Sequence, residues 1–97
     1  MFNSVNRLAG RTIYSIEVVT TGDGLSVETE GGSLTFLAQR PFGKVEGSCD
    51  SVLLVCGLSS RSVRDAALSA WLKKKVGDVR RLGAVCVGAF LLAEAGL

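Results

Sequence analysis

The spacing of apolar and polar positions divides the chain into short elements. Apolar residues recur at helical spacing near the N-terminus, at Phe2, Val5 and Leu8, and Gly10 stands where a helix C-cap would. The chain is therefore predicted to open inside a helix or at its end. A β-branched run over Thr12–Thr20 then predicts a mostly buried strand, which a glycine-rich turn signal ends.

The middle of the chain is less regular. Residues Leu25–Thr29 alternate apolar and polar side chains, which predicts a minor edge strand that ends at the glycine pair Gly31-Gly32. From Ser33 to Ser48 the pattern breaks up around a proline and two glycines. This stretch is predicted to be irregular, with a short turn at Ser33–Phe36.

The second half has the pattern of a parallel sheet. Residues Ser51–Cys56 are continuously apolar, which predicts a strand buried on both faces. Ser62 and Asp65 resemble a capping box, and the apolar stripe that follows predicts a helix to about Val76. Leu82–Cys86 is predicted to be a second buried strand.

A last helix is predicted over Ala89–Ala95, closed by Gly96. The order of elements contains one strand–helix–strand unit, which indicates an α/β fold with a parallel sheet. Ligands of such sheets bind at the carboxyl ends of the strands. Those ends are predicted at Cys56-Gly57 and Cys86-Val87-Gly88.

Composition limits the partners. The 97 residues fit a single domain, since domains usually have about 50–250 residues. A net charge of +2 is too small to serve as the electrostatic footprint of a nucleic-acid-binding protein. The basic residues Lys73 to Lys75, Arg80 and Arg81 are interpreted as a solvated helix end and turn. Any DNA binding by these residues is expected to be weak and indifferent to sequence.

The cysteines number three, with no signal-peptide pattern and no zinc-site spacing, which predicts a cytoplasmic protein without a metal or other cofactor. The longest apolar run, Gly83 to Ala93, is shorter than the roughly 20 residues that a membrane helix needs. Histidine is absent, so these residues alone cannot complete a Ser-His or Cys-His pair.

Cys86 carries the candidate chemistry. It is the last residue of a predicted strand, and Gly88 follows just before a helix, which is the arrangement of a nucleophile elbow. The helix N-terminus would face the sulfur, and backbone N–H groups would lie near enough to hold an oxyanion. The alternative is a core cysteine, because cysteine is among the residues most often buried.

The segment Leu82–Leu97 resembles the corresponding segment of ThiJ/PfpI-like domains, which are similar to class I glutamine amidotransferases, in AraC-type transcription regulators. The resemblance extends over nearly the whole chain, although only its last third is diagnostic. Upstream residues agree in order with the family: Asn6-Arg7-Leu8, Tyr14, Gly24, Val27, Asp50 to Gly57, and Trp71-Leu72.

The resemblance implies a partial doubly wound, flavodoxin-like, mostly parallel sheet with flanking helices and a small edge hairpin. It also implies one partial domain over residues 1–97, in which the first strand, the C-terminal part and the DNA-binding domain are absent. Relatives continue beyond Gly96-Leu97 into a segment that holds a histidine. In a sheet of order 2-1-3-4 the absent strand would leave an open lane between Thr12–Thr20 and Ser51–Cys56.

The resemblance also implies a site. Cys86 matches the elbow nucleophile, here expected to be vestigial, and the ligand pocket would involve Gly57, Leu58, Val87 and Gly88, with backbone amides from Leu58 and Val87. The chain departs from the family at Leu58, because relatives often have a pair of glycines there. The side chain at this position hinders close approach of a ligand to the backbone.

Three functions remain open from the sequence. The preferred hypothesis is a sensing and oligomerising domain of an AraC-type regulator, which binds a small-molecule effector, associates as a dimer and reaches DNA only through a helix-turn-helix domain outside these residues. The alternative is part of a ThiJ/PfpI-like cysteine enzyme, similar to isonitrile hydratase, glyoxalase or a hydrolase, with Cys86 as nucleophile. A third is a decayed gene fragment without activity.

Overall fold

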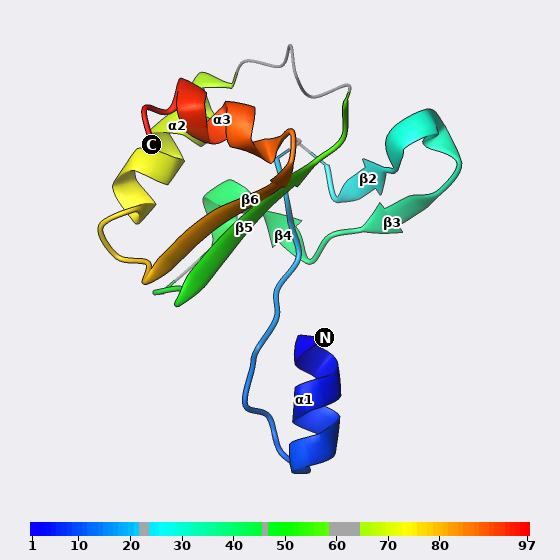
Figure 1. The fold of residues 1–97 in the computed structure, drawn as a ribbon. Helices are drawn as coiled ribbons and strands as arrows, with labels where there is room; N and C mark the ends of the chain where they lie inside the picture. The colour runs from blue at the N-terminus through cyan, green and yellow to red at the C-terminus, as the bar shows by residue number, and fades with distance from the viewer. Residues whose placement is uncertain (22–23, 46, 59–64) are drawn as a thin grey trace.

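The computed structural model describes residues 1–21, 24–45, 47–58 and 65–97. The chain forms helices and short strands, and Figure 1 shows helix α1 standing apart from the other elements. The elements are α1 (Phe2–Ala9), β1 (Val19–Thr20), β2 (Ser26–Glu28), η1 (Glu30–Gly32), β3 (Thr35–Leu37), β4 (Arg40–Pro41), η2 (Phe42–Lys44), β5 (Ser51–Cys56), α2 (Ala66–Lys75), β6 (Arg81–Cys86) and α3 (Gly88–Glu94).

Helix α1 confirms the first helical prediction. It ends at Gly10, which adopts the left-handed conformation (φ 67°) that glycine takes without a Cβ penalty. The backbone N–H of Gly10 donates to the carbonyl of Arg7 at 3.2 Å and so satisfies one of the last carbonyls of the helix. No residue of α1 is buried.

The strand predicted over Thr12–Thr20 is wrong for most of its length, because only Val19–Thr20 is a strand. β1 pairs in parallel with β4, in the register Val19 to Arg40 and Thr20 to Pro41. The pairing extends to Val18, whose N–H donates to the Gln39 side chain at 2.5 Å and whose carbonyl accepts from the Gln39 N–H at 2.8 Å. A β-branched sequence becomes a strand only where another strand lies beside it, and the apolar residues before Val18 are half-exposed instead of buried.

The predicted edge strand is confirmed as β2, and its partner is a strand that the sequence pattern did not reveal. β3 lies inside the stretch predicted to be irregular and pairs antiparallel with β2, in the register Ser26 to Leu37 and Glu28 to Thr35. The turn between them is η1, which precedes the predicted turn at Ser33–Phe36. Both apolar side chains of β3 are exposed, so the backbone pairing and not a buried face defines this strand.

The strand–helix–strand unit is confirmed as β5, α2 and β6, with β5 and β6 parallel from the pair Ser51 and Arg81 to the pair Cys56 and Cys86. Asp65 is itself the N-cap of α2, since its side chain accepts from the N–H of Leu68 at 2.9 Å. It is therefore not the third residue of the predicted capping box, whose Ser62 lies outside the described residues. Helix α2 ends with Val76 as its C-cap.

The hydrophobic core lies on one face of the β5–β6 pair. Helices α2 and α3 both pack on this side. The buried residues come from β5, α2, α3 and the C-cap of α3: Leu54, Leu68, Leu72, Leu91 and Ala95. On the opposite side Leu53, Val55 and Val85 are about half-exposed or more. The prediction that β5 and β6 are buried on both faces is therefore wrong, although the α/β class and the parallel pairing are confirmed.

Among the described residues the strands form three separate pairs, β1 with β4, β2 with β3, and β5 with β6. The arrangement is a partial flavodoxin-like fold with a small hairpin, as predicted. Across the described ranges, β1 pairs with β4 and not with β5, so the lane predicted between these two strands is not bridged by backbone hydrogen bonds.

Candidate functional site

The predicted site residues lie at one edge of the β5–β6 pair. Cys56 and Cys86 are register partners at the carboxyl ends of the two strands. Gly57 and Leu58 continue from β5, and Val87 continues from β6. All the candidate positions therefore begin at the same end of the same parallel pair, which is where α/β sheets bind ligands.

Cys86 has an unusual backbone conformation. Its φ is 58°, and it is the one non-glycine residue with positive φ in the part of the chain that the structure describes. Such a conformation is costly for a residue with a Cβ and persists only where the surrounding structure imposes it. The side chain is exposed at this point.

Gly88 imposes the turn. A Cβ on Gly88 would lie 2.5 Å from the carbonyl oxygen of Leu54, so only glycine lets the start of α3 approach β5 this closely. Val87 and Gly88 are both buried, and the N–H of Phe90 donates to the Val87 carbonyl at 2.9 Å. The turn is thus seated on the core while the thiol of Cys86 faces outward.

The other two cysteines are less accessible. Cys56 is partly buried against the core, and Cys49 is partly buried in the segment before β5. The alternative considered for Cys86, that it is a core cysteine, therefore describes Cys56 better. Leu58 is exposed and Gly57 is partly buried, which leaves the backbone of this turn near the surface.

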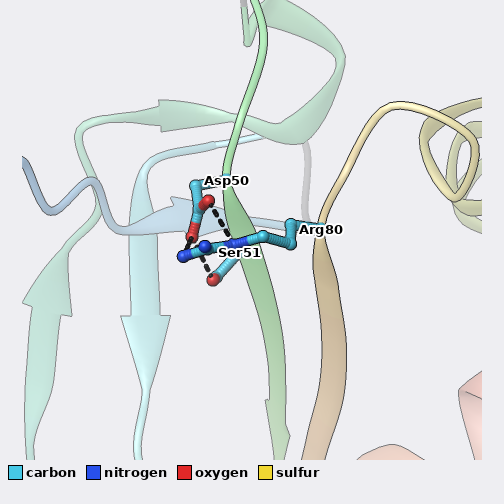
Figure 2. A network of polar contacts seen from close by, with 3 residues as sticks. All are labelled: Asp50, Ser51 and Arg80. Carbon is cyan, nitrogen blue, oxygen red and sulfur yellow. Dashed lines mark hydrogen bonds and ion pairs between the residues drawn. The ribbon is translucent and has the colours of Figure 1, made fainter.

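A polar network lies at the opposite, amino end of the pair (Figure 2). The Asp50 carboxylate accepts from the Ser51 hydroxyl at 2.8 Å and pairs with Arg80, whose Nε lies 2.9 Å from Oδ1. The Asp50 backbone carbonyl also accepts from the N–H of Arg80 at 2.8 Å. The Ser51 hydrogen bond, assisted by Arg80, lowers the pKa of Asp50. This network fixes where β6 begins beside β5.

The sequence pattern indicated a solvated helix end and turn for the basic residues. It did not predict the ion pair between Arg80 and Asp50. Lys75 also has partners, since its ammonium donates to the Gly47 carbonyl at 3.1 Å and lies 5.8 Å from the centre of the Trp71 ring. Opposite charges separated by 30 positions cannot be paired from sequence spacing alone.

A shallow hollow of about 400 Å³ lies near the start of α2, and Cys86 does not line it. Its most polar residues are Lys44 and Asp65, and the Asp65 carboxylate is already occupied by the N–H of Leu68. Within the described ranges, no three His, Cys, Asp or Glu side chains are grouped to hold a metal ion. None of the helices in those ranges is long and apolar enough to cross a membrane.

The fold and the site together define an α/β domain in which a parallel strand ends in an exposed cysteine and turns directly into a helix. A comparison with protein families identifies the family of this domain, because the model of the DJ-1/PfpI family matches residues 2–97. The chain belongs to the DJ-1/PfpI family.

The chain is also similar to a transcription regulator. It is 47% identical over 49 residues to the HTH-type transcriptional regulator Rv1931c of Mycobacterium tuberculosis. The matched segment is 50% of this chain and 19% of that protein, so the chain spans only about a fifth of its relative's length. No solved structure matches the chain.

Proposed function

We propose that this chain is the effector-sensing and oligomerising part of an AraC-type transcription regulator of the cytoplasm, without catalytic turnover of its own. The observation that carries the proposal is the 47% identity to a protein named as an HTH-type transcriptional regulator. Membership of the DJ-1/PfpI family is compatible with both a regulator and an enzyme, and the identity to this relative is what favours the regulator.

The edge that carries Cys86 is the proposed effector site. An exposed thiol, the backbone of Val87 and the backbone of Gly57 and Leu58 would contact a small molecule with both polar and apolar groups. Gly88 seats this turn on β5, so a ligand there would contact two elements that share one core. Ligand binding could in this way bias the packing of α3 on the sheet.

DNA recognition is assigned to a helix-turn-helix domain outside these residues. The net charge of +2 would neutralise few phosphates, and affinity for DNA depends strongly on the number neutralised. We expect the chain alone to bind DNA weakly, with strong salt dependence and no preference for sequence.

The alternative is a cysteine enzyme of the same family. The exposed Cys86 with φ 58° favours it, because strained backbone often positions reacting groups. No histidine in these 97 residues can take the proton of the thiol, so turnover would need a base from another source.

Two assays distinguish these functions. In the first assay the chain is fused to a DNA-binding domain that is monomeric by itself and represses a reporter only as a dimer. The fusion is expected to repress the reporter. The isolated chain is expected to give no turnover of p-nitrophenyl acetate or methylglyoxal above buffer. Turnover that disappears in Cys86→Ser, together with a silent reporter, would replace the regulator with the enzyme.

A further inference from the structure

Two of the cysteines lie next to each other across the β5–β6 pair. Cys56 and Cys86 are register partners, and each is the last residue of its strand. Neighbouring strands of a sheet run about 4.7–4.9 Å apart, and the Cα atoms of disulfide-bonded cysteines are usually about 4.4–6.8 Å apart. The backbone spacing at these two positions therefore suits a disulfide without movement of either strand.

The two side chains differ in how firmly they are held. Cys56 follows the buried Leu54 by two positions and packs against the same core, as side chains of one strand face do. Cys86 is exposed, and its left-handed backbone sets it apart from the regular alternation of β6. An exposed side chain turns between staggered χ1 rotamers without a change of backbone. The Cys86 sulfur is therefore the one that moves when the two approach.

The difference in exposure also gives the two thiols different roles. A dissolved oxidant reaches the exposed Cys86 before the partly buried Cys56. Thiols that sense oxidants are solvent-accessible and often lie beside a second cysteine that resolves the oxidised sulfur. Cys49 is placed differently, because it precedes β5, and the strand rises about 17 Å from Ser51 to Cys56. Cys49 thus lies toward the opposite end of the strand pair.

We propose that Cys56 and Cys86 form a reversible disulfide when the chain meets hydrogen peroxide. The Cys86 sulfur attacks one peroxide oxygen, the O–O bond breaks, and Cys86 becomes a sulfenic acid as one water is released. The Cys56 thiol then displaces the hydroxyl group of that sulfenic acid, which forms the S–S bond and releases a second water. Two thiols are oxidised to one disulfide while one peroxide is reduced to two waters. A thiol such as glutathione restores both cysteines by exchange through a mixed disulfide.

The bond would change the edge of the sheet that carries the proposed effector site. It ties the carboxyl ends of β5 and β6 together and removes the exposed thiol from that edge. In a reducing cytoplasm such disulfides are transient and serve redox sensing. This use of the bond rests on the proposed effector-sensing function, whereas the bond itself rests only on the register and the exposure of the two cysteines.

Mapping of the cysteines after oxidation tests the bond. The folded chain, kept dilute, is treated with a small excess of hydrogen peroxide, and the remaining thiols are blocked with N-ethylmaleimide. Trypsin and an Asp-specific protease then separate Cys49 from Cys56 at Asp50. Cys56–Cys86 is expected to be the main disulfide, and dithiothreitol should release it. The reference is oxidation in urea, where loop closure favours the pair nearest in sequence, Cys49–Cys56, by about tenfold over Cys56–Cys86.

Two variants, checked for folding by circular dichroism, identify the role of each cysteine. Cys49→Ser should retain the Cys56–Cys86 bond at the wild-type yield. Cys56→Ala should leave Cys86 without its resolving partner, so that Cys86 gains oxygen and accumulates as sulfinic acid.

The wild-type map decides the outcome even if a variant folds poorly. A folded chain that yields no Cys56–Cys86 disulfide, or no larger a share of it than the chain in urea, would overturn the proposal. The mapping uses neither a reporter nor an effector. The bond can therefore fail to form while the regulator function stands, and the reverse.

Discussion

Position 86 combines an exposed sulfur with a backbone conformation that few non-glycine residues adopt. Its neighbour Gly88 supplies the reason, because the contact with the Leu54 carbonyl holds the turn in place. The sequence revealed the residue types and the order strand, cysteine, glycine, helix. It could not reveal the exposure of the thiol, which depends on how the three segments meet.

Cys86 is expected to react with iodoacetamide faster than Cys49 and Cys56, because it is exposed and they are partly buried. Mass mapping after a short reaction at mildly alkaline pH measures the order of labelling. Cys86→Ser should remove the fast phase and leave the slower labelling unchanged. Labelling of Cys49 first, with Cys86 protected until denaturation, would contradict this prediction.

Gly88→Ala is expected to lower the free energy of unfolding by about 1–3 kcal/mol, because the new methyl group would collide with the Leu54 carbonyl. Urea denaturation followed by circular dichroism measures the loss. Gly77→Ala is the control, since a Cβ there meets nothing within 4 Å. An equal effect of the two substitutions would show that α3 does not pack closely on β5.

At the level of single elements, those defined by a local sequence pattern could be predicted, and those defined by pairing with a distant strand could not. α1, β5, β6 and α3 were predictable because their apolar spacing and flanking glycines are local signals. The strand at Thr12–Thr20 was overextended because a β-branched run does not say whether a neighbour is present. β3 was missed because pairing with β2 defines it, and its own side chains are exposed.

Asp65→Ala is expected to destabilise α2 by about 1 kcal/mol, because it removes the acceptor for the N–H of Leu68. Thermal unfolding compares it with Asp65→Asn, which retains a good N-cap and should stay within a few tenths of a kcal/mol of the wild type. If the asparagine variant loses as much stability as the alanine variant, the Asp65 carboxylate does not stabilise α2 by capping it.

The Asp50 network should make stability depend on pH in one direction. The lowered pKa of Asp50 means that its ionised form stabilises the fold at pH values above the ordinary 3.8, and that this contribution is lost as the pH falls through the folded-state pKa. Asp50→Asn should therefore be less stable than the wild type at neutral pH, and the difference should shrink in acid. The effect will be small, since both partners are largely exposed.

Urea titrations at neutral pH and at about pH 3 measure this difference. Asp78→Asn, which changes an exposed acid in the turn after α2, controls for net charge. A gap between wild type and Asp50→Asn that widens on acidification would reverse the sign and refute the assignment.

At the scale of the whole molecule, the packing is uneven. One core joins β5, β6, α2 and α3, while α1 has no buried residue. The sequence predicted a self-associating chain with bare apolar surfaces. It placed them at strand edges beside an empty lane or on apolar helix faces, and the structure shows exposed apolar residues on one face of the β5–β6 pair as well.

The attachment of α1 through Asn6 and the Phe2–Tyr14 contact has a kinetic consequence. In a single chain the amide hydrogens of α1 can exchange with solvent by local fraying, while those of β5 and β6 exchange only when the shared core opens. Deuterium uptake followed by mass spectrometry should therefore show early labelling of residues 1–10 and late labelling of 51–56 and 81–86. If a partner covers α1, its labelling will slow as protein concentration rises, so the protection of this helix reports assembly in a solution at equilibrium.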